Sequence, residues 1–241
     1  MANFPFQRLQ ADLAKLIAET PPGSRLMSEP DLAKQMGVSR ATLREAMRTF
    51  ETQGLIRRRQ GSGTYVVGKF QVIEAGLEVL ESIETMARRM NLEVSVSDLY
   101  IEQTNADSKI AEGLCVEEGT PYVRVRRVMR AESRPVAYLI DSLPLNILKV
   151  DELANEFRGS VLDHLIGSGV DLQVSRAAIS ATNAVAEVAK ALEIQRDDVL
   201  LKFASQLYDG KGTLVDYSVS YFIPGYFHFH VNRRIGNGAS V

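Results

Sequence analysis

Hydrophobic residues near the N-terminus recur at helical spacing, in short segments separated by turn signals. The first segment spans residues 6–19, and the Pro-Pro-Gly motif at 21–23 ends it. Its apolar face is formed by residues three and four positions apart, namely Leu9, Leu13, Leu16 and Ile17. A second helix is expected over residues 28–37, with Ser28 as its N-cap and Gly37 ending it in the left-handed conformation.

A third amphipathic helix follows almost at once. Only Val38 separates Gly37 from Ser39, which we expect to cap this helix. Its buried face is predicted to consist of Leu43, Ala46, Met47 and Phe50. Two short helices joined by a tight turn form a helix-turn-helix, whose second helix can enter the major groove of DNA. The polar residues of the third helix lie mostly off the apolar face and toward its N-terminal half: Arg40, Thr42, Arg44 and Arg48.

The next segment has the pattern of a β-hairpin. We expect "LIRRRQ" and "TYVV" to be strands and "GSG" at 61–63 to be the turn, which together would form a wing. Glycine allows positive φ and lets the main chain approach a DNA backbone closely. Strand alternation places Arg57 and Arg59 on one face and Arg58 on the other, and we include Arg58 among the expected DNA contacts. Taken alone, the run is equally well explained as a solvated charged segment.

The remaining sequence mixes strand and helix patterns. Residues 71–91 are expected to form a linker helix, with a stripe made by Ile73, Leu77, Leu80 and Ile83. Beyond it, alternating segments such as "YVRVRRVMRA", "PVAYLIDSLP" and "VLLKFASQLYD" are predicted strands, and "VLDHLIGSG" and "NAVAEVAKALEI" are predicted helices. The expected fold class is α+β, with a helix-turn-helix domain over 1–70 and an antiparallel sheet domain over 92–235.

Charge divides the chain into two parts. Residues 1–70 hold eleven Lys and Arg against six Asp and Glu, a net charge of +5, and the rest of the chain nets −7. A basic module joined to an acidic body suggests that only the first part meets a polyanion. Cys115 is the only cysteine, so no disulfide within the chain is expected. For His228 and His230 we expect ordinary packing or hydrogen bonding, and we expect no metal and no cofactor.

Strand parity identifies one unusual arginine. In "YVRVRRVMRA" the odd positions are apolar and directed to the core, except for Arg127. An unpaired charge there would cost several kcal/mol. Arg127 therefore either lines a pocket for an anionic ligand or pairs with a buried carboxylate such as Asp216 or Asp141.

The segment "SEPDLAKQMGVSRATLREAMRTFETQGLIRRRQGSGTYV" resembles the winged helix-turn-helix of GntR-type bacterial transcription regulators. The shared motifs are a Ser-Glu helix start, Gly-Val-Ser-Arg, a Thr-Leu-Arg-Glu-Ala helix and a Gly-Ser-Gly-Thr wing. The resemblance implies DNA contacts from the helix start, the recognition helix and the wing, namely Ser28, Glu29, Arg40, Thr42, Arg44, Gly61 and Gly63.

The order of segments from "RVRRVMRA" to "YSVSYFIPGY" resembles the UTRA effector domain of the HutC branch of these regulators. The resemblance implies a chorismate-lyase-like fold that binds a small molecule, with effector contacts at Arg127, Ser160, Asp216, Tyr221 and Tyr226. Met129 and Leu162 replace an arginine and a tyrosine typical of relatives that bind sugar phosphates. These departures favour a smaller or more apolar effector with one acid group. Ser160 is equally well explained as an N-cap.

The sequence therefore predicts a cytoplasmic, ligand-responsive transcriptional regulator. We expect neither enzymatic activity nor a membrane partner. The expected partners are near-palindromic operator DNA, bound as a homodimer, and an anionic or carboxylate-bearing metabolite. The alternatives are a chorismate-lyase-like enzyme with a DNA-binding head and a DNA-binding protein that needs no effector. The segment order and motifs contain no Ser-His-Asp arrangement or Gly-rich phosphate loop that would favour the enzyme.

Overall fold

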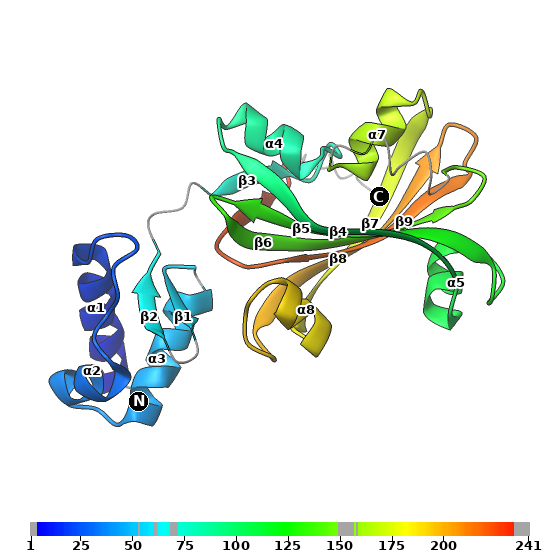
Figure 1. Cartoon of the computed structure of the whole chain (residues 1–241). Coiled ribbons are helices and arrows are strands. Elements are labelled where there is room, and N and C mark those ends of the chain that lie inside the picture. The colour runs from blue at the N-terminus through cyan, green and yellow to red at the C-terminus, as the bar shows by residue number, and fades with distance from the viewer. Residues whose placement is uncertain are drawn as a thin grey trace, which may run out of the picture. The chain divides into compact units, whose positions relative to one another are not determined.

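The computed structural model describes residues 4–52, 54–59, 62–67, 72–148, 157 and 159–233. The chain divides into two compact units. The first comprises Met1–Val72 with Ile223–Tyr226, and the second comprises Ile73–Phe222 with Phe227–Val241 (Figure 1). The expected α+β class is confirmed, because a helical module precedes an antiparallel sheet domain.

The first unit contains three helices and a two-stranded hairpin. Its elements are α1 (Phe4–Glu19), α2 (Glu29–Met36), α3 (Arg40–Thr52), β1 (Ile56–Arg59) and β2 (Gly63–Val66). The predicted helical faces meet in one core, which includes Leu9, Leu13, Ile17, Leu32, Leu43, Met47, Phe50, Ile56 and Val66. The α2 helix begins at Ser28, whose hydroxyl accepts from the Asp31 backbone N–H, and ends at Gly37 with φ 66°. These caps confirm the helix ends expected from the sequence.

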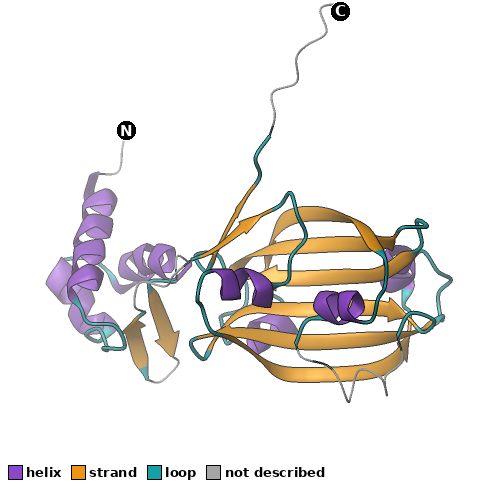
Figure 2. Cartoon of the chain, turned by 90° about the horizontal axis from the view of Figure 1, so that it is seen from above, coloured by secondary structure: helices purple, strands orange, loops and turns teal. Residues whose placement is uncertain are grey.

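The second unit is built on a six-stranded antiparallel sheet with the order β4-β5-β6-β9-β8-β7. The strands are β4 (Val94–Asn105), β5 (Pro121–Ala131), β6 (Arg134–Pro144), β7 (Leu172–Asn183), β8 (Val199–Asp209) and β9 (Leu214–Phe222). Helices α4 (Ile83–Arg89) and α7 (Val161–Gly167) cover one face, and α5 (Ser108–Leu114) and α8 (Ala186–Ala191) cover the other (Figures 1 and 2).

Strand alternation assigns separate apolar cores to the two faces. Val123 and Val125 of β5 pack with Val161 and Leu165 of α7 on one side. Tyr122 packs with the α5 side on the other, in a smaller cluster with Ala106, Ala111 and Leu114. The sheet is therefore buried on both faces over part of its area, which is why several of its strands lack a simple polar and apolar alternation.

The expected linker helix over 71–91 is wrong in its first part. Residues Ile73–Gly76 form strand β3, which pairs in parallel with β10 (Phe227–His230), and helix structure begins only at Ile83. Ile73 and Ala75 are buried while Glu74 is exposed, which is a two-residue period rather than a helical one. Within the described residues, no helix is long and apolar enough to span a bilayer.

Candidate functional site

The N-terminal half of α3 presents polar side chains to solvent. Ser39 caps the helix, because its hydroxyl accepts from the Thr42 backbone N–H at 3.1 Å and also lies 2.9 Å from the Thr42 hydroxyl. Arg40 and Arg44 are exposed in the same turns, while Leu43 between them is fully buried. The apolar face thus fixes the helix, and the two arginines point away from the core.

Glu29, at the start of α2, holds two arginines of other elements. Its carboxylate lies 2.6 Å from Arg44 Nε and 3.8 Å from Arg58 Nε. Arg58 also lies 3.5 Å from the Glu51 carboxylate and donates to the Arg44 carbonyl at 3.1 Å, and its side chain is only 15% exposed. Arg58 therefore ties strand β1 to helices α2 and α3. Arg44 is 63% exposed and remains accessible beside Glu29.

The hairpin β1–β2 is the expected wing. The strands pair antiparallel, with Arg57 opposite Tyr65 and Arg58 opposite Thr64. Gly63 has φ 112°, and a Cβ atom there would overlap the Arg25 guanidinium, so both backbone conformation and space favour glycine. Gly61, the other expected wing contact, lies outside the described residues.

A cavity of about 850 Å³ lies within the second unit, on the sheet face that α4 and α7 cover. Its floor is formed by side chains of β5, β6, β8 and β9, and its cover by α4, α7 and the segment after β3. The lining includes three of the five residues expected to contact an effector, Arg127, Ser160 and Asp216. The structure therefore brings these three to one place.

Arg127 points into the core, as strand alternation predicted, and it is only 5% exposed. Its guanidinium pairs with Asp141, one of the two carboxylates proposed from the sequence. The same residue also lines the cavity, so Arg127 both pairs with a buried carboxylate and faces a pocket. Asp141 offsets the positive charge of Arg127, while Arg127 Nε is buried and has no hydrogen-bond partner among the described residues.

Asp216 completes this cluster. It is buried on β9, its Oδ1 accepts from the Ser142 backbone N–H at 3.2 Å, and it shares a hydrogen bond with Asp141. Burial, followed by the charge of Asp141, raises the pKa of Asp216 well above its usual value. The raised pKa favours the protonated form of Asp216, whose O–H can donate to Asp141.

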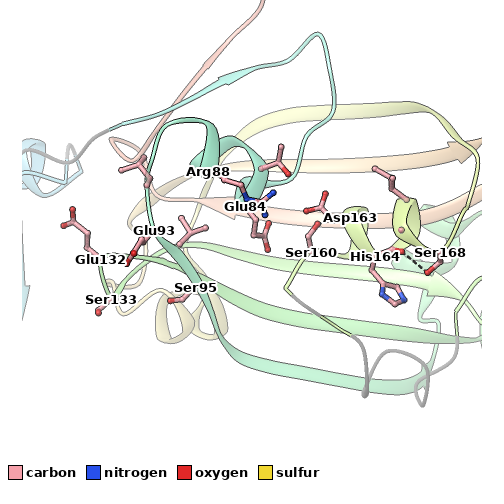
Figure 3. Close-up of a pocket in the computed structure, with 15 residues that line it drawn as sticks. Glu84, Arg88, Glu93, Ser95, Glu132, Ser133, Ser160, Asp163, His164 and Ser168 are labelled. Carbon is pink, nitrogen blue, oxygen red and sulfur yellow. Dashed lines mark hydrogen bonds between the residues drawn. The ribbon is translucent and has the colours of Figure 1, made fainter.

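Ser160 and Glu84 approach the cluster from the cover. Ser160 is the N-cap of α7, accepting from the Asp163 backbone N–H at 3.0 Å, and it also lines the cavity. Glu84 of α4 has a pKa raised mainly by burial. A second cavity of about 1240 Å³ shares Glu84 and Ser160 with the first, and its remaining lining includes Arg88, Asp163 and His164 (Figure 3).

The other two expected effector contacts, Tyr221 and Tyr226, are not part of the lining of this cavity. Tyr221 points to the opposite face of β9 from Asp216. Its ring stacks on that of Tyr138, with ring centroids 6.5 Å apart. Tyr138 in turn donates to Glu187 of α8, and burial followed by this hydrogen bond raises the pKa of Tyr138 to about 12. Tyr226 follows β9 in the turn Ile223–Tyr226, which groups with the first unit.

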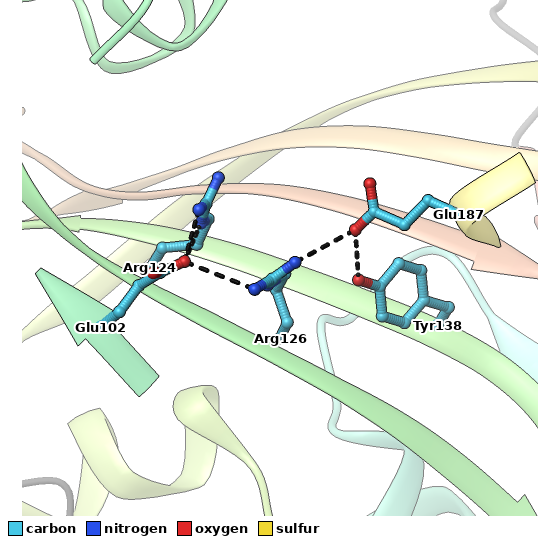
Figure 4. Close-up of polar contacts among 5 residues, drawn as sticks. All are labelled: Glu102, Arg124, Arg126, Tyr138 and Glu187. Atoms are coloured by element: carbon cyan, nitrogen blue, oxygen red, sulfur yellow. Dashed lines mark hydrogen bonds and ion pairs between the residues drawn. The ribbon is translucent and has the colours of Figure 1, made fainter. Parts of the chain in front are cut away.

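A polar network stabilises that opposite face. Glu102 pairs with Arg124 and lies 3.5 Å from Arg126, and Arg126 reaches Glu187 at 3.2 Å (Figure 4). Tyr138 completes the chain of contacts through the same Glu187 oxygen. Because these charges satisfy one another, we interpret the network as structural.

The histidines of β10 make the ordinary polar contacts expected of them. His228 Nδ1 lies 2.9 Å from Glu74, and His230 Nδ1 lies 3.7 Å from the same carboxylate. Across the described ranges, no group of three His, Cys, Asp or Glu side chains is arranged to hold a metal ion.

Comparison with known proteins agrees with both units. Residues 89–228 match the UTRA domain, and residues 6–66 match the bacterial regulatory proteins of the gntR family. The chain is a GntR-family regulator with a UTRA domain. The family resemblance inferred from the sequence is thereby confirmed, and the protein is a DNA-binding transcriptional regulator of this type.

Relatives of this GntR regulator include two named repressors. The chain is 26% identical over 227 residues to the mannosyl-D-glycerate transport/metabolism system repressor MngR of Escherichia coli strain K12, covering 92% of this chain and 93% of MngR. It is 24% identical over 210 residues to the HTH-type transcriptional repressor NagR of Bacillus subtilis strain 168, covering 85% and 83%. The crystal structure of PhnF from Mycobacterium smegmatis shares the fold, with a TM-score of 0.63 and 21% identity over 95% of this chain and 100% of PhnF.

Sequence reasoning missed part of the cavity of this UTRA domain. Asp216, Ser218 and Ser220 alternate along β9 and all line it, so a two-residue period would have added both serines. The same period would have placed Tyr221 on the other face. Glu84 carried no such signal, because it reaches the cavity from a helix that the sequence assigned to a linker.

Proposed function

We propose that this protein is a ligand-responsive transcriptional repressor that binds near-palindromic operator DNA as a homodimer, in the bacterial cytoplasm. The observation that carries the proposal is the capped, exposed N-terminal half of α3, with Arg40 and Arg44 beside a glycine-containing wing. Recognition helices present this part to base edges, and arginine makes bidentate contacts with guanine.

The proposed DNA contacts divide by role. Arg40, Thr42 and Arg44 would reach base edges or phosphates in the major groove, and the wing glycines would let the main chain approach the backbone. Glu29 and Arg58 would act through Arg44, because both contact it directly. The full set is Ser28, Glu29, Arg40, Thr42, Arg44, Arg58, Gly61 and Gly63.

Effector response is proposed for the cavity in the second unit. Arg127, Ser160 and Asp216 line it, and its cover comes from short helices and from the segment after β3. A molecule bound there would bridge sheet and cover, and so favour one arrangement of the cover over others. The relatives MngR and NagR are repressors, which supports repression as the direction of regulation.

The sheet edge supports the proposed homodimer. Among the described strands, β7 pairs with β8 alone, and its twelve residues are largely exposed, including Val174 and Ile179. A long, apolar edge strand is a template for pairing with another chain unless something covers it. A second copy related by a two-fold axis would cover it.

The test begins with selection of bound sequences from a pool of random duplexes. Fluorescence anisotropy then measures the affinity of the full chain for the selected duplex. We expect Arg44→Ala to weaken binding by about tenfold or more, a loss of roughly 1–3 kcal/mol. Arg196→Ala, which removes an exposed positive charge from the second unit, is the matched control and should leave the affinity unchanged. Equal affinities for wild type and Arg44→Ala would contradict the proposal.

A further inference from the structure

The interior of the UTRA cavity holds more acid groups than positive charges. Glu84 from α4, Asp141 from β6 and Asp216 from β9 all line it. Among the described residues of the lining, Arg127 supplies the single guanidinium; Asp141 pairs with its Nη1, while its Nε is buried without a hydrogen-bond partner. A phosphate or carboxylate entering this space would meet carboxyl groups without an uncompensated cation. The charge balance therefore favours a ligand that brings positive charge.

Glu84 is the acid group with the greatest need for a partner. Its Oε1 is buried and has no hydrogen-bond partner among the described residues. A buried acceptor left without a donor is unfavourable, and such groups are uncommon in native proteins. A ligand that donates hydrogen bonds at this point would satisfy it. An ammonium group suits the position because it carries three donors and no acceptor.

The floor of the cavity adds hydroxyl groups beside this acidic end. Ser205 on β8 lies opposite Ser218 on β9, and Ser220 follows on the same face. These three serines line the cavity, and their side chains make no hydrogen bond to another described residue. Phe203 and Phe222 form an apolar wall next to them, with ring centroids 5.1 Å apart. The lining thus offers acceptors for an amine, hydroxyls for a polar ligand and one apolar side.

We infer that the cavity receives a positively charged, amine-bearing small molecule that also carries hydroxyl groups. Its ammonium group would lie between Glu84 and the Asp141–Asp216 pair, and its hydroxyl groups would meet the serines of β8 and β9. The inference rests on the proposed function only in taking this cavity as the effector site. A cationic ligand differs from the anionic effector that we expected from the sequence because of Arg127.

Proton release should accompany binding of such a ligand. The groups that face Asp216 are Asp141 on β6, Arg127 on β5 and the Ser142 backbone N–H, with Glu84 of α4 on the cover side. Burial, followed by the charge of Asp141, raises the pKa of Asp216 and so favours its protonated form. An ammonium group placed there favours the ionised form of Asp216, so the proton leaves as the amine enters. Affinity for the amine should consequently rise with pH across the range in which Asp216 is protonated in the unliganded protein.

The experiment compares small probes of similar size that carry either positive or negative charge. Thermal unfolding of the full chain is measured with glucosamine, glucuronate and a hexose phosphate, and with putrescine against succinate, each at millimolar concentration. We expect the amines to raise the unfolding temperature and the acids not to do so. Titration calorimetry with the best amine, in two buffers of different ionisation enthalpy, should detect proton release on binding.

Two variants and a control locate the effect. Glu84→Gln and Asp216→Asn should each weaken amine binding by about tenfold. Glu118→Gln removes an exposed acid group that is not part of the cavity lining and should bind as the wild type does. Stabilisation by glucuronate, succinate or the phosphate, failure of every amine, or equal loss in Glu118→Gln would overturn the inference. Operator binding measured on the same preparations separates this failure from a failure of the proposed function.

Discussion

Substituting Asp216 with asparagine should stabilise the second unit at neutral pH. Asp216 is 5% exposed, and burial beside Asp141 raises its pKa well above the usual value. A group whose pKa is raised on folding contributes stability below its unfolded pKa, about 3.9, and that stability is lost as the pH rises through the folded pKa. Between the two pKa values, the folded chain retains a proton that the unfolded chain has already released.

The magnitude follows from this difference in proton binding. Each pH unit in which only the folded state holds the proton costs about 1.4 kcal/mol. Asparagine avoids this cost, its Oδ1 can accept from the Ser142 N–H, and its amide N–H can replace the donor to Asp141. We expect the free energy of unfolding to rise by roughly 1–3 kcal/mol near pH 7 and to change little near pH 4.

Guanidinium unfolding followed by circular dichroism would measure the effect, since the chain has no tryptophan for fluorescence. Asp209→Asn is the control of opposite sign. Hydrogen bonds from the Thr213 and Lys211 backbone lower the pKa of Asp209, so its contribution exists at neutral pH and is lost on acidification. A loss of stability in Asp216→Asn at neutral pH, or a gain that does not vary with pH, would refute the reasoning.

Three further predictions concern the other sites. Glu29→Gln should lower operator affinity severalfold, as measured by fluorescence anisotropy, because Arg44 loses the carboxylate that lies 2.6 Å from its Nε. A higher affinity would mean that Glu29 only competes with DNA phosphates for Arg44. Arg127→Met should lower the free energy of unfolding by about 3 kcal/mol at neutral pH, because Asp141 is left buried without its partner. Chemical denaturation measures this, and an unchanged free energy of unfolding would contradict it. Ile179→Glu, which charges the β7 edge, should raise the dimer dissociation constant about tenfold or more in sedimentation experiments, and unchanged dimerisation would exclude this edge.

The DNA-binding head was predictable because its signals are local. Ser28, Gly37 and Ser39 mark helix ends within a few residues of the helices that they cap. The apolar positions between them recur at helical spacing and meet in one core. The role of Arg58 was not predictable in the same way, because its partners Glu29 and Glu51 belong to two other elements.

The second unit was less predictable because its pairings are distant in sequence. Strand β3 exists because β10, from the far end of the chain, pairs with it, and the stripe that suggested a helix there ignored the alternation of Ile73, Glu74 and Ala75. Parity did identify Arg127 as inward-facing. Its partner depended on the register of neighbouring strands, which brings Asp141 and Asp216 to the same face.

The most direct test of the account is the affinity of the full chain for a selected duplex against a random duplex, each measured over a range of salt concentrations. The account predicts binding to the selected duplex at least about a thousandfold tighter, with affinity falling steeply as salt increases. Arg44→Ala should reduce both the preference and the slope. Equal affinity for the two duplexes, or affinity unaffected by salt, would contradict the claim that the capped α3 helix and its wing read DNA.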